Sequence, residues 1–204
     1  MDQTLAYTDV SDFMRALRQE DGTPARALEF TILTAARTGE TIGAKWSEID
    51  LGQGIWTIPG ARMKAGKEHR VPLSPRAVAI LEQMKNTRGT VAKDDEIDTF
   101  VFPAARRGKP LPKMTFLLLL ERLGRTDLTI HGFRSTFRDW AAEQTSFPRE
   151  VAEMALAHII GDKTEAAYRR GDLFQKRQQL MDAWARHCAA TGRKNTGEVI
   201  SIAR

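Results

Sequence analysis

The side chains with the most potential for chemistry are an unusual set of cations and one tyrosine. In chain order they are Arg37, Lys64, His131, Arg134, His158 and Tyr168. A free tyrosine has a pKa of ~10 and is a poor nucleophile at neutral pH. Cations favour its phenolate, and Arg169 and Arg170 directly follow Tyr168. Lys64 lies beside a predicted hairpin turn, where a lysine can donate a proton, contact a phosphate or simply be exposed.

Each of the other candidates also has a purely structural interpretation. An arginine next to buried residues needs an anionic partner, and Glu40 could supply it for Arg37 as a plain structural pair. His131 and His158, taken singly, are more often satisfied structural histidines than catalytic ones. Tyr168 could equally be a half-buried aromatic residue with a wet hydroxyl. Only the combination of these residues is informative.

Several common catalytic motifs are missing from the sequence. It contains no Gly-x-x-x-x-Gly-Lys-Ser/Thr loop and no Gly-x-Ser-x-Gly elbow. The four histidines lack metal-ligand spacing, and the acidic run at 94–98 lacks the pattern of a calcium loop, so a solvated charge run is its simplest interpretation. The single cysteine, Cys188, cannot form an internal disulfide and fits a reducing compartment. We therefore expect no metal and no cofactor.

Positive charge is concentrated in two segments. The chain carries 31 Lys and Arg against 26 Asp and Glu, a formal net charge of +5. Residues 58–76 hold five basic side chains and one acidic one, and residues 104–125 hold six basic and one acidic. Such concentration is the electrostatic footprint of a polyanion partner, of which DNA is the commonest, although two solvated loops would look the same.

Length and periodicity describe the elements that must position these residues. With 204 residues and 42% hydrophobic content, the chain is expected to form one soluble domain, mostly helical and of α+β class. Its longest apolar run, 116–120, is far below the ~20 residues of a membrane helix, and its first residues do not resemble a signal peptide. Helices are expected over 10–20, 24–36, from about 40, 75–88, 113–123, 132–145, 148–157, 164–170 and 173–190.

A small three-stranded antiparallel sheet is expected to pack on this helical core. Its strands are predicted over 46–51, 55–58 and 69–73, the last at an edge because it contains Pro72. Arg37 then ends an apolar helix, and His131 and Arg134 share one face at a helix start. The last helix has an apolar stripe that we interpret as core packing or, alternatively, as a docking surface for a neighbouring subunit; it comprises Leu173, Phe174, Leu180, Met181, Trp184 and Cys188.

The order Arg, Lys, His-x-x-Arg, His, Tyr resembles the catalytic domain of the tyrosine recombinases, or phage integrases, over about residues 9–190. The likeness is closest to integrases of satellite phages, prophages and genomic islands. It is carried by the stretches 35–40, 45–50, 63–74, 131–134, 155–158 and 166–171. Two positions depart from the family pattern: Ala35 stands where many relatives have glycine, and Ala157 replaces the glycine commonly found before the second histidine.

The resemblance implies metal-free cleavage and rejoining of DNA. Tyr168 would attack a phosphodiester and form a 3′-phosphotyrosyl link, while Arg37 and Arg134 grip the phosphate oxygens. Lys64 would be the general acid for the departing 5′-oxygen. His131 and His158 would bind phosphate oxygens or assist proton transfer to and from the tyrosine, and Glu40 would support the site. No ATP is needed, because the phosphotyrosyl ester preserves the energy of the bond.

The resemblance also implies partners and a domain organisation. Residues 1–190 would be the catalytic domain, without the N-terminal DNA-binding domains usual in the family, and residues 191–204 a flexible tail. The partner would be double-stranded DNA, bound as a homo-tetramer of a protein that is monomeric when free, in the bacterial cytoplasm. Contacts with the DNA backbone are expected from Lys67, Arg70, Arg106, Arg107 and Lys109.

Three alternatives remain open from the sequence. A type IB topoisomerase-like enzyme would use the same chemistry to relax supercoils. A non-catalytic DNA-binding module would keep the fold without the reaction, although all six candidate residues are present. A metal-dependent nuclease would use the acidic run at 94–98.

Overall fold

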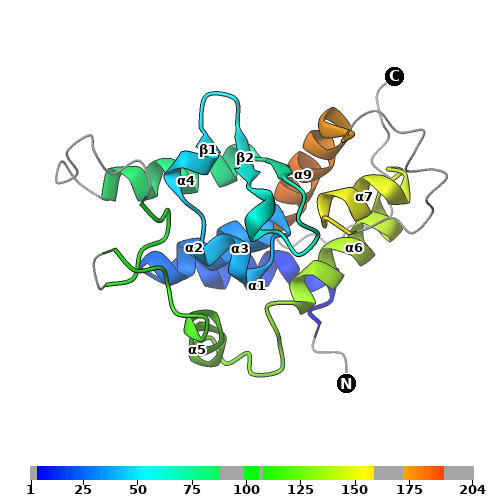
Figure 1. Ribbon diagram of the computed structural model, residues 1–204. Helices are drawn as coiled ribbons and strands as arrows, with labels where there is room; N and C mark the ends of the chain where they lie inside the picture. Colours follow the sequence, from blue (N-terminus) through cyan, green and yellow to red (C-terminus); the bar gives the residue numbers. More distant parts are fainter. Residues whose placement is uncertain (1–3, 88–98, 106–107, 159–171, 191–204) are drawn as a thin grey trace.

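The computed structural model describes residues 4–87, 99–105, 108–158 and 172–190. Figure 1 shows a body of packed helices with a small sheet on one side. The α-helices are α1 (Val10–Gln19), α2 (Thr23–Thr34), α3 (Thr38–Ile42), α4 (Pro75–Thr87), α5 (Thr115–Arg122), α6 (Gly132–Gln144), α7 (Arg149–Ala155) and α9 (Phe174–Ala189). Short 3₁₀ helices are η1 (Tyr7–Asp9), η2 (Trp46–Glu48) and η3 (Gly60–Arg62). The predicted mostly helical α+β class is confirmed.

The sheet has three antiparallel strands in the order β1 (Ile49–Asp50), β2 (Ile55–Ile58) and β3 (His69–Pro72). Ile55 pairs with Pro72 and Ile58 with His69. β3 is an edge strand, as its proline predicted, because proline has no N–H to donate to a further strand. The β2–β3 connection carries Lys64, so the sheet presents that lysine on a loop.

The first predicted strand, over 46–51, is too long. Residues 46–48 form η2, and only Ile49 and Asp50 pair with β2. The reason lies in Glu48, which is buried and whose carboxylate accepts a hydrogen bond from Trp56 Nε1–H at 2.9 Å and pairs with Arg62. A buried carboxylate needs such partners, and the turn at η2 directs Glu48 toward them.

Most helix predictions agree with the structure to within two residues at each end, with two exceptions. The helix expected from about residue 40 is α3, which starts at Thr38 and spans only five residues. The helix expected over 164–170 lies outside the described residues. Within the described ranges, no helix combines the length and the hydropathy that crossing a membrane would require.

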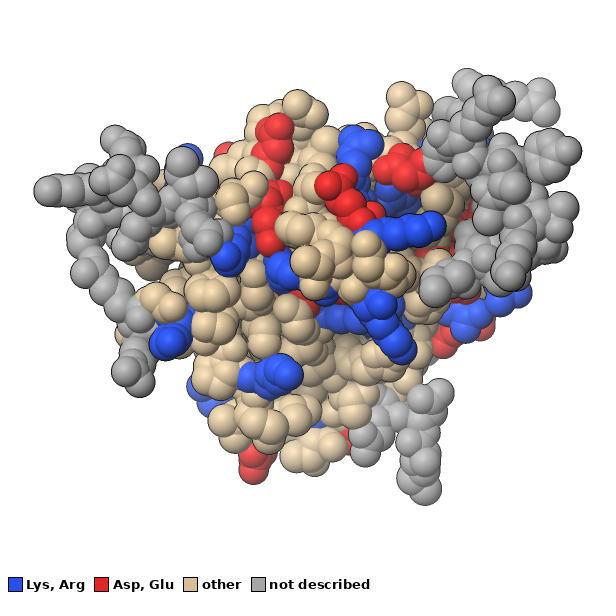
Figure 2. Space-filling view, in the orientation of Figure 1, with Lys and Arg blue, Asp and Glu red and all other residues tan. Residues whose placement is uncertain are grey.

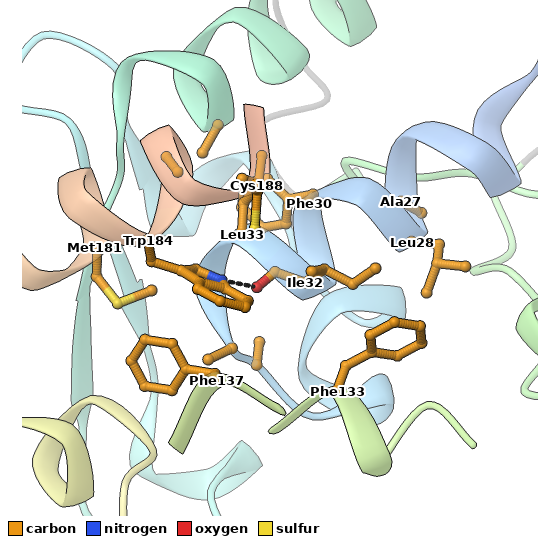
Figure 3. Packing of buried hydrophobic residues seen from close by; sticks show 14 of the residues in the cluster. Ala27, Leu28, Phe30, Ile32, Leu33, Phe133, Phe137, Met181, Trp184 and Cys188 are labelled. Atoms are coloured by element: carbon orange, nitrogen blue, oxygen red, sulfur yellow. Dashed lines mark hydrogen bonds between the residues drawn. The ribbon is translucent and has the colours of Figure 1, made fainter. Parts of the chain in front are cut away.

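The core lies where α9 packs against α1, α2, α6 and α7 (Figure 1). Figure 3 shows Trp184 of α9 directed toward α2, where its Nε1–H donates to the carbonyl of Ile32 at 2.9 Å. Phe137 of α6 meets the Trp184 ring edge-on at 5.5 Å between centroids. The apolar stripe of α9 is thus core packing at its most buried positions, which are Leu180, Met181, Trp184 and Cys188.

Candidate active site

Arg37 and Glu40 form a tight unit at the junction between α2 and α3. The Arg37 backbone N–H donates to Glu40 Oε2 at 2.8 Å, and its guanidinium Nη1 donates to Oε1 at 2.8 Å. Glu40 is 6% exposed, whereas the Arg37 side chain is 29% exposed. The predicted ion pair is confirmed. The ion pair engages Nη1 of the guanidinium, and the Arg37 side chain remains partly exposed at the surface.

The helices α2 and α7 end in the same way. After α2, Ala36 N–H donates to Thr31 O and Ala35 N–H to Ile32 O, both at 3.2 Å. This double bonding is the Schellman motif, whose cap residue adopts a left-handed conformation, and Ala35 has a φ of 49°. The backbone thereby turns sharply at the end of α2.

At the end of α7, His158 N–H donates to Glu153 O at 2.9 Å, and Ala157 N–H donates to Met154 O at 3.1 Å. Ala157 has a φ of 50°, again left-handed. The two departures from the family pattern, Ala35 and Ala157, therefore lie at two helix caps where glycine is the preferred residue.

The buried guanidinium of Arg134 joins these two helix ends. Arg134, in the first turn of α6, is 5% exposed; Nη1 donates to the carbonyl of Ala35, and Nη2 donates to the carbonyl of Leu156 at 2.6 Å. Burial and then the nearby Arg37 guanidinium lower the pKa of Arg134 to about 10, so it remains charged at neutral pH. The two carbonyls are neutral, so they orient the guanidinium without neutralising its positive charge.

A pocket of about 240 Å³ opens at this place. Its lining includes both arginines and the first histidine, and comprises Ala36, Arg37, Thr38, Gly39, Ile130, His131 and Arg134. His131 is exposed at the N-terminus of α6, where the helix dipole adds partial positive charge. The N-terminus of α3 lies at the same pocket through Thr38 and Gly39. A pocket with this lining suits an anion with several oxygens, such as a phosphate diester.

His158 adjoins the pocket through Arg134. Its Nε2 lies 3.3 Å from Arg134 Nη2, and its Nδ1 lies 2.6 Å from Glu153 Oε2. His158 follows the left-handed Ala157, so it lies beyond the end of α7. The Schellman turn is the reason, since it reverses the chain before the histidine.

Lys64 lies on the loop between η3 and β3 and outside the lining of this pocket. The predicted turn is present, because Gly66 N–H donates to Met63 O at 3.0 Å and Gly66 has a φ of 67°. Gly60 packs so closely on this loop that a Cβ there would lie 2.6 Å from Gly66 O. The lysine is exposed on a loop with a well-defined base. Tyr168 lies outside the described residues.

The predicted DNA-backbone contacts fall in different places. Lys67 and Lys109 are exposed, whereas Arg106 and Arg107 lie outside the described residues. Arg70 lies 3.5 Å from the Asp172 carboxylate and 4.3 Å above the centre of the Phe174 ring, so its charge is partly used within the chain. Figure 2 shows lysine and arginine side chains across the middle of one face, with acidic groups mainly above them.

Sequence reasoning did not single out His69, Glu153 or Arg177. His69 on β3 hydrogen-bonds the Ala155 backbone; burial and then the charge of Arg177 lower its pKa to about 4. Arg177 is 2% exposed and holds Asp172 and the carbonyl of Arg70. Only three-dimensional proximity connects these residues with the site, although His69 lies inside the 63–74 stretch that carries the family resemblance.

The model of the phage integrase family matches residues 3–172 of the chain. The chain belongs to the phage integrase family. It is similar to the prophage integrase IntA of Escherichia coli (strain K12), with 37% identity over 156 residues that cover 76% of this chain and 36% of IntA. The prophage integrase IntZ of the same strain is 34% identical over 184 residues, which cover 87% of this chain and 43% of IntZ.

The fold agrees with this membership. The integrase from mycobacterium phage Brujita superimposes with a TM-score of 0.62 at 19% identity, covering 93% of this chain and 60% of the Brujita chain. The present chain spans less than half the length of IntA and IntZ. The family match confirms the predicted resemblance to the tyrosine recombinases, or phage integrases. Both IntA and IntZ are prophage integrases, which agrees with the predicted likeness to integrases of prophages.

Proposed function

We propose that this chain is the catalytic part of a site-specific DNA recombinase that integrates and excises a prophage or genomic island. The observation that carries the proposal is the pocket shared by Arg37, His131 and Arg134, which come from distant parts of the sequence. Membership of the phage integrase family supports it. We propose that residues 1–190 form the catalytic domain; residues 191–204, expected from the sequence to form a tail, lie outside the described residues.

The two arginines stabilise the phosphate during strand cleavage. Attack at phosphorus builds negative charge on the non-bridging oxygens, and preorganised donors stabilise charge that develops in the transition state. Arg134 is held in place by two carbonyls before any substrate arrives, and Arg37 by Glu40. Both therefore meet the phosphate without first being reordered, and His131 adds a donor from the start of α6.

Tyr168 supplies the nucleophile in this proposal. Its phenolic O–H bond breaks as its oxygen bonds to phosphorus, and the bond from phosphorus to the 5′-oxygen breaks. Lys64, on its loop, donates a proton to that leaving oxygen, so the products are a 3′-phosphotyrosyl ester and a free 5′-hydroxyl. The reverse sequence rejoins a strand. His158 exchanges the phenolic proton.

Double-stranded DNA is the proposed partner, and synapsis of two sites is proposed to assemble a tetramer from monomers. Backbone contacts come from Lys67, Arg70, Arg106, Arg107 and Lys109. Because such contacts release counterions, binding should weaken steeply with salt.

The substitution Tyr168→Phe tests the proposal. The probe is a nicked duplex library with randomised central base pairs, in which cleavage lets the nicked fragment diffuse away and traps the covalent adduct. The wild-type chain should form an adduct whose peptide map contains Tyr168, and Tyr168→Phe should form none while retaining DNA in a filter-binding assay. An adduct that persists in Tyr168→Phe would overturn the proposed nucleophile.

The experiment also discriminates a topoisomerase-like activity. Relaxation of a supercoiled plasmid that lacks a selected site, with no strand exchange between paired sites, would favour that alternative. The sequences enriched in the adducts identify the cleavage site, so the exchange assay can then use matched pairs of that site.

A further inference from the structure

Glu153 and His158 are linked twice at the end of α7. The His158 backbone N–H donates to the Glu153 carbonyl at 2.9 Å, as part of the helix cap. Independently, His158 Nδ1 lies 2.6 Å from Glu153 Oε2. One contact places the backbone and the other places the ring, so the imidazole is constrained in both position and rotation.

Glu153 is itself held firmly. Arg138 of α6 donates to Oε1 at 2.8 Å, Arg149 of α7 lies 3.7 Å from the same oxygen, and the Glu153 side chain is 14% exposed. Burial alone would raise the pKa of Glu153, but the hydrogen bond from His158 and the charge of Arg138 outweigh it, so the pKa lies below its usual range. Glu153 is therefore a carboxylate at neutral pH, which can only accept hydrogen bonds.

The two contacts of the ring determine where its proton resides. Because the Glu153 carboxylate only accepts, Nδ1 must carry the hydrogen of that contact. Because a guanidinium only donates, Nε2 must present its lone pair to Arg134 Nη2, 3.3 Å away. The neutral Nδ1–H tautomer satisfies both neighbours, whereas the Nε2–H tautomer satisfies neither.

We propose that Glu153 is a positioning residue that fixes the orientation and tautomer of His158 and leaves Nε2 as the proton-accepting atom beside Arg134. A carboxylate that orients a catalytic imidazole in this way also stabilises the imidazolium that forms when the ring takes up a proton. In the reaction, Nε2 accepts the phenolic proton and returns it when the tyrosine leaves. That last assignment rests on the proposed function, whereas the tautomer does not.

The tautomer can be measured without DNA. Long-range ¹H–¹⁵N correlation spectra of the full chain, in alkaline buffer where imidazole rings are neutral, distinguish the two tautomers, and His158→Gln assigns the signals. We expect the Nδ1–H form in the wild type, loss of its predominance in Glu153→Met, and its retention in Arg138→Gln, which keeps the direct contact. A wild-type ring in the Nε2–H form, or the same tautomer in wild type and Glu153→Met, would overturn the proposal.

A kinetic measurement tests the consequence. With the nicked duplex library, Glu153→Met should slow formation of the covalent adduct at least about tenfold, while DNA retention stays unchanged. Glu153→Gln, which keeps an acceptor but not the charge, should lie between wild type and Glu153→Met in rate. A Glu153→Met rate equal to that of the wild type would contradict the positioning role. Absence of any adduct from the wild type would contradict the proposed function instead, and the spectra would still decide the role of Glu153.

Discussion

Arg134 is buried and still lines the pocket that we propose to bind phosphate. Two backbone carbonyls hold its guanidinium, and among the described residues its Nε has no hydrogen-bond partner. Carbonyl oxygens carry only partial negative charge, so they orient the cation without neutralising it. A lysine could not reproduce this arrangement, because it lacks the planar fork that reaches both carbonyls.

We predict that Arg134→Lys lowers the rate of strand cleavage by about 100-fold or more, the size of effect seen when one preorganised oxyanion donor is lost. DNA retention should change far less, because Arg134 is one contact among many. Lys67→Ala is the matched comparison. It should weaken DNA binding and reduce by about one the slope of the logarithm of the binding constant against the logarithm of the salt concentration. Cleavage of bound DNA should stay intact. Equal losses of binding and cleavage in Arg134→Lys would indicate that Arg134 contributes to DNA binding and not to the cleavage step.

At the scale of elements, two helix ends build the site. α2 and α7 stop in Schellman turns, and the carbonyls freed there converge on Arg134. Both turns place an alanine in the left-handed region, at Ala35 and Ala157. An L-residue with a side chain is strained in this conformation by roughly 1–2 kcal/mol, which glycine avoids.

Ala157→Gly should therefore stabilise the fold by about 1 kcal/mol, as measured by urea unfolding. The control is Ala142→Gly on the exposed side of α6, where glycine has no conformational advantage and should destabilise by about 0.5–1 kcal/mol. The opposite signs separate the cap effect from the general entropic cost of glycine. Destabilisation by both substitutions would argue against a strained cap at Ala157.

At the scale of the whole molecule, one buried carboxylate connects three helices. Glu29 of α2 is fully buried and is contacted by Arg18 of α1 at 2.7 Å and Arg76 of α4 at 2.9 Å, with Arg26 at 3.4 Å. Burial opposes ionisation of Glu29, but the hydrogen bonds from Arg76 and Arg18 outweigh it and lower its pKa. This cluster holds the N-terminal helices against α4.

Glu29→Gln should reduce the free energy of unfolding at neutral pH by about 3 kcal/mol, because it removes the buried carboxylate charge that pairs with the partly buried Arg18, Arg26 and Arg76. The folded-state pKa of Glu29 is below the unfolded value, so its stabilisation is present above the unfolded pKa of about 4.3 and is lost as pH falls through the folded value. Urea unfolding at a series of pH values should show the two proteins converge in acid. If the difference in free energy of unfolding between wild type and Glu29→Gln stays constant with pH, ionisation of Glu29 is not the source of the stabilisation.

Local features of the amino-acid sequence were enough to predict most of the secondary structure and the family. Helical periodicity located most of the helices, Pro72 indicated an edge strand, and the order of six polar residues indicated the family. These features are encoded locally, in spacing and residue type, and so they can be read without knowing which segments meet.

The assembly of the candidate site could not be predicted from these local features. The carbonyls of Ala35 and Leu156 reach Arg134 across long stretches of chain, and Glu153 reaches His158 because a left-handed cap turns the backbone between them. The short β1 also depends on tertiary contacts, because Glu48 pairs with Trp56 and Arg62, which the periodicity of the sequence does not reveal. Hydrogen bonds of buried groups depend on which atoms the fold brings within about 3 Å of each other. The spacing of residues along the chain does not determine that distance.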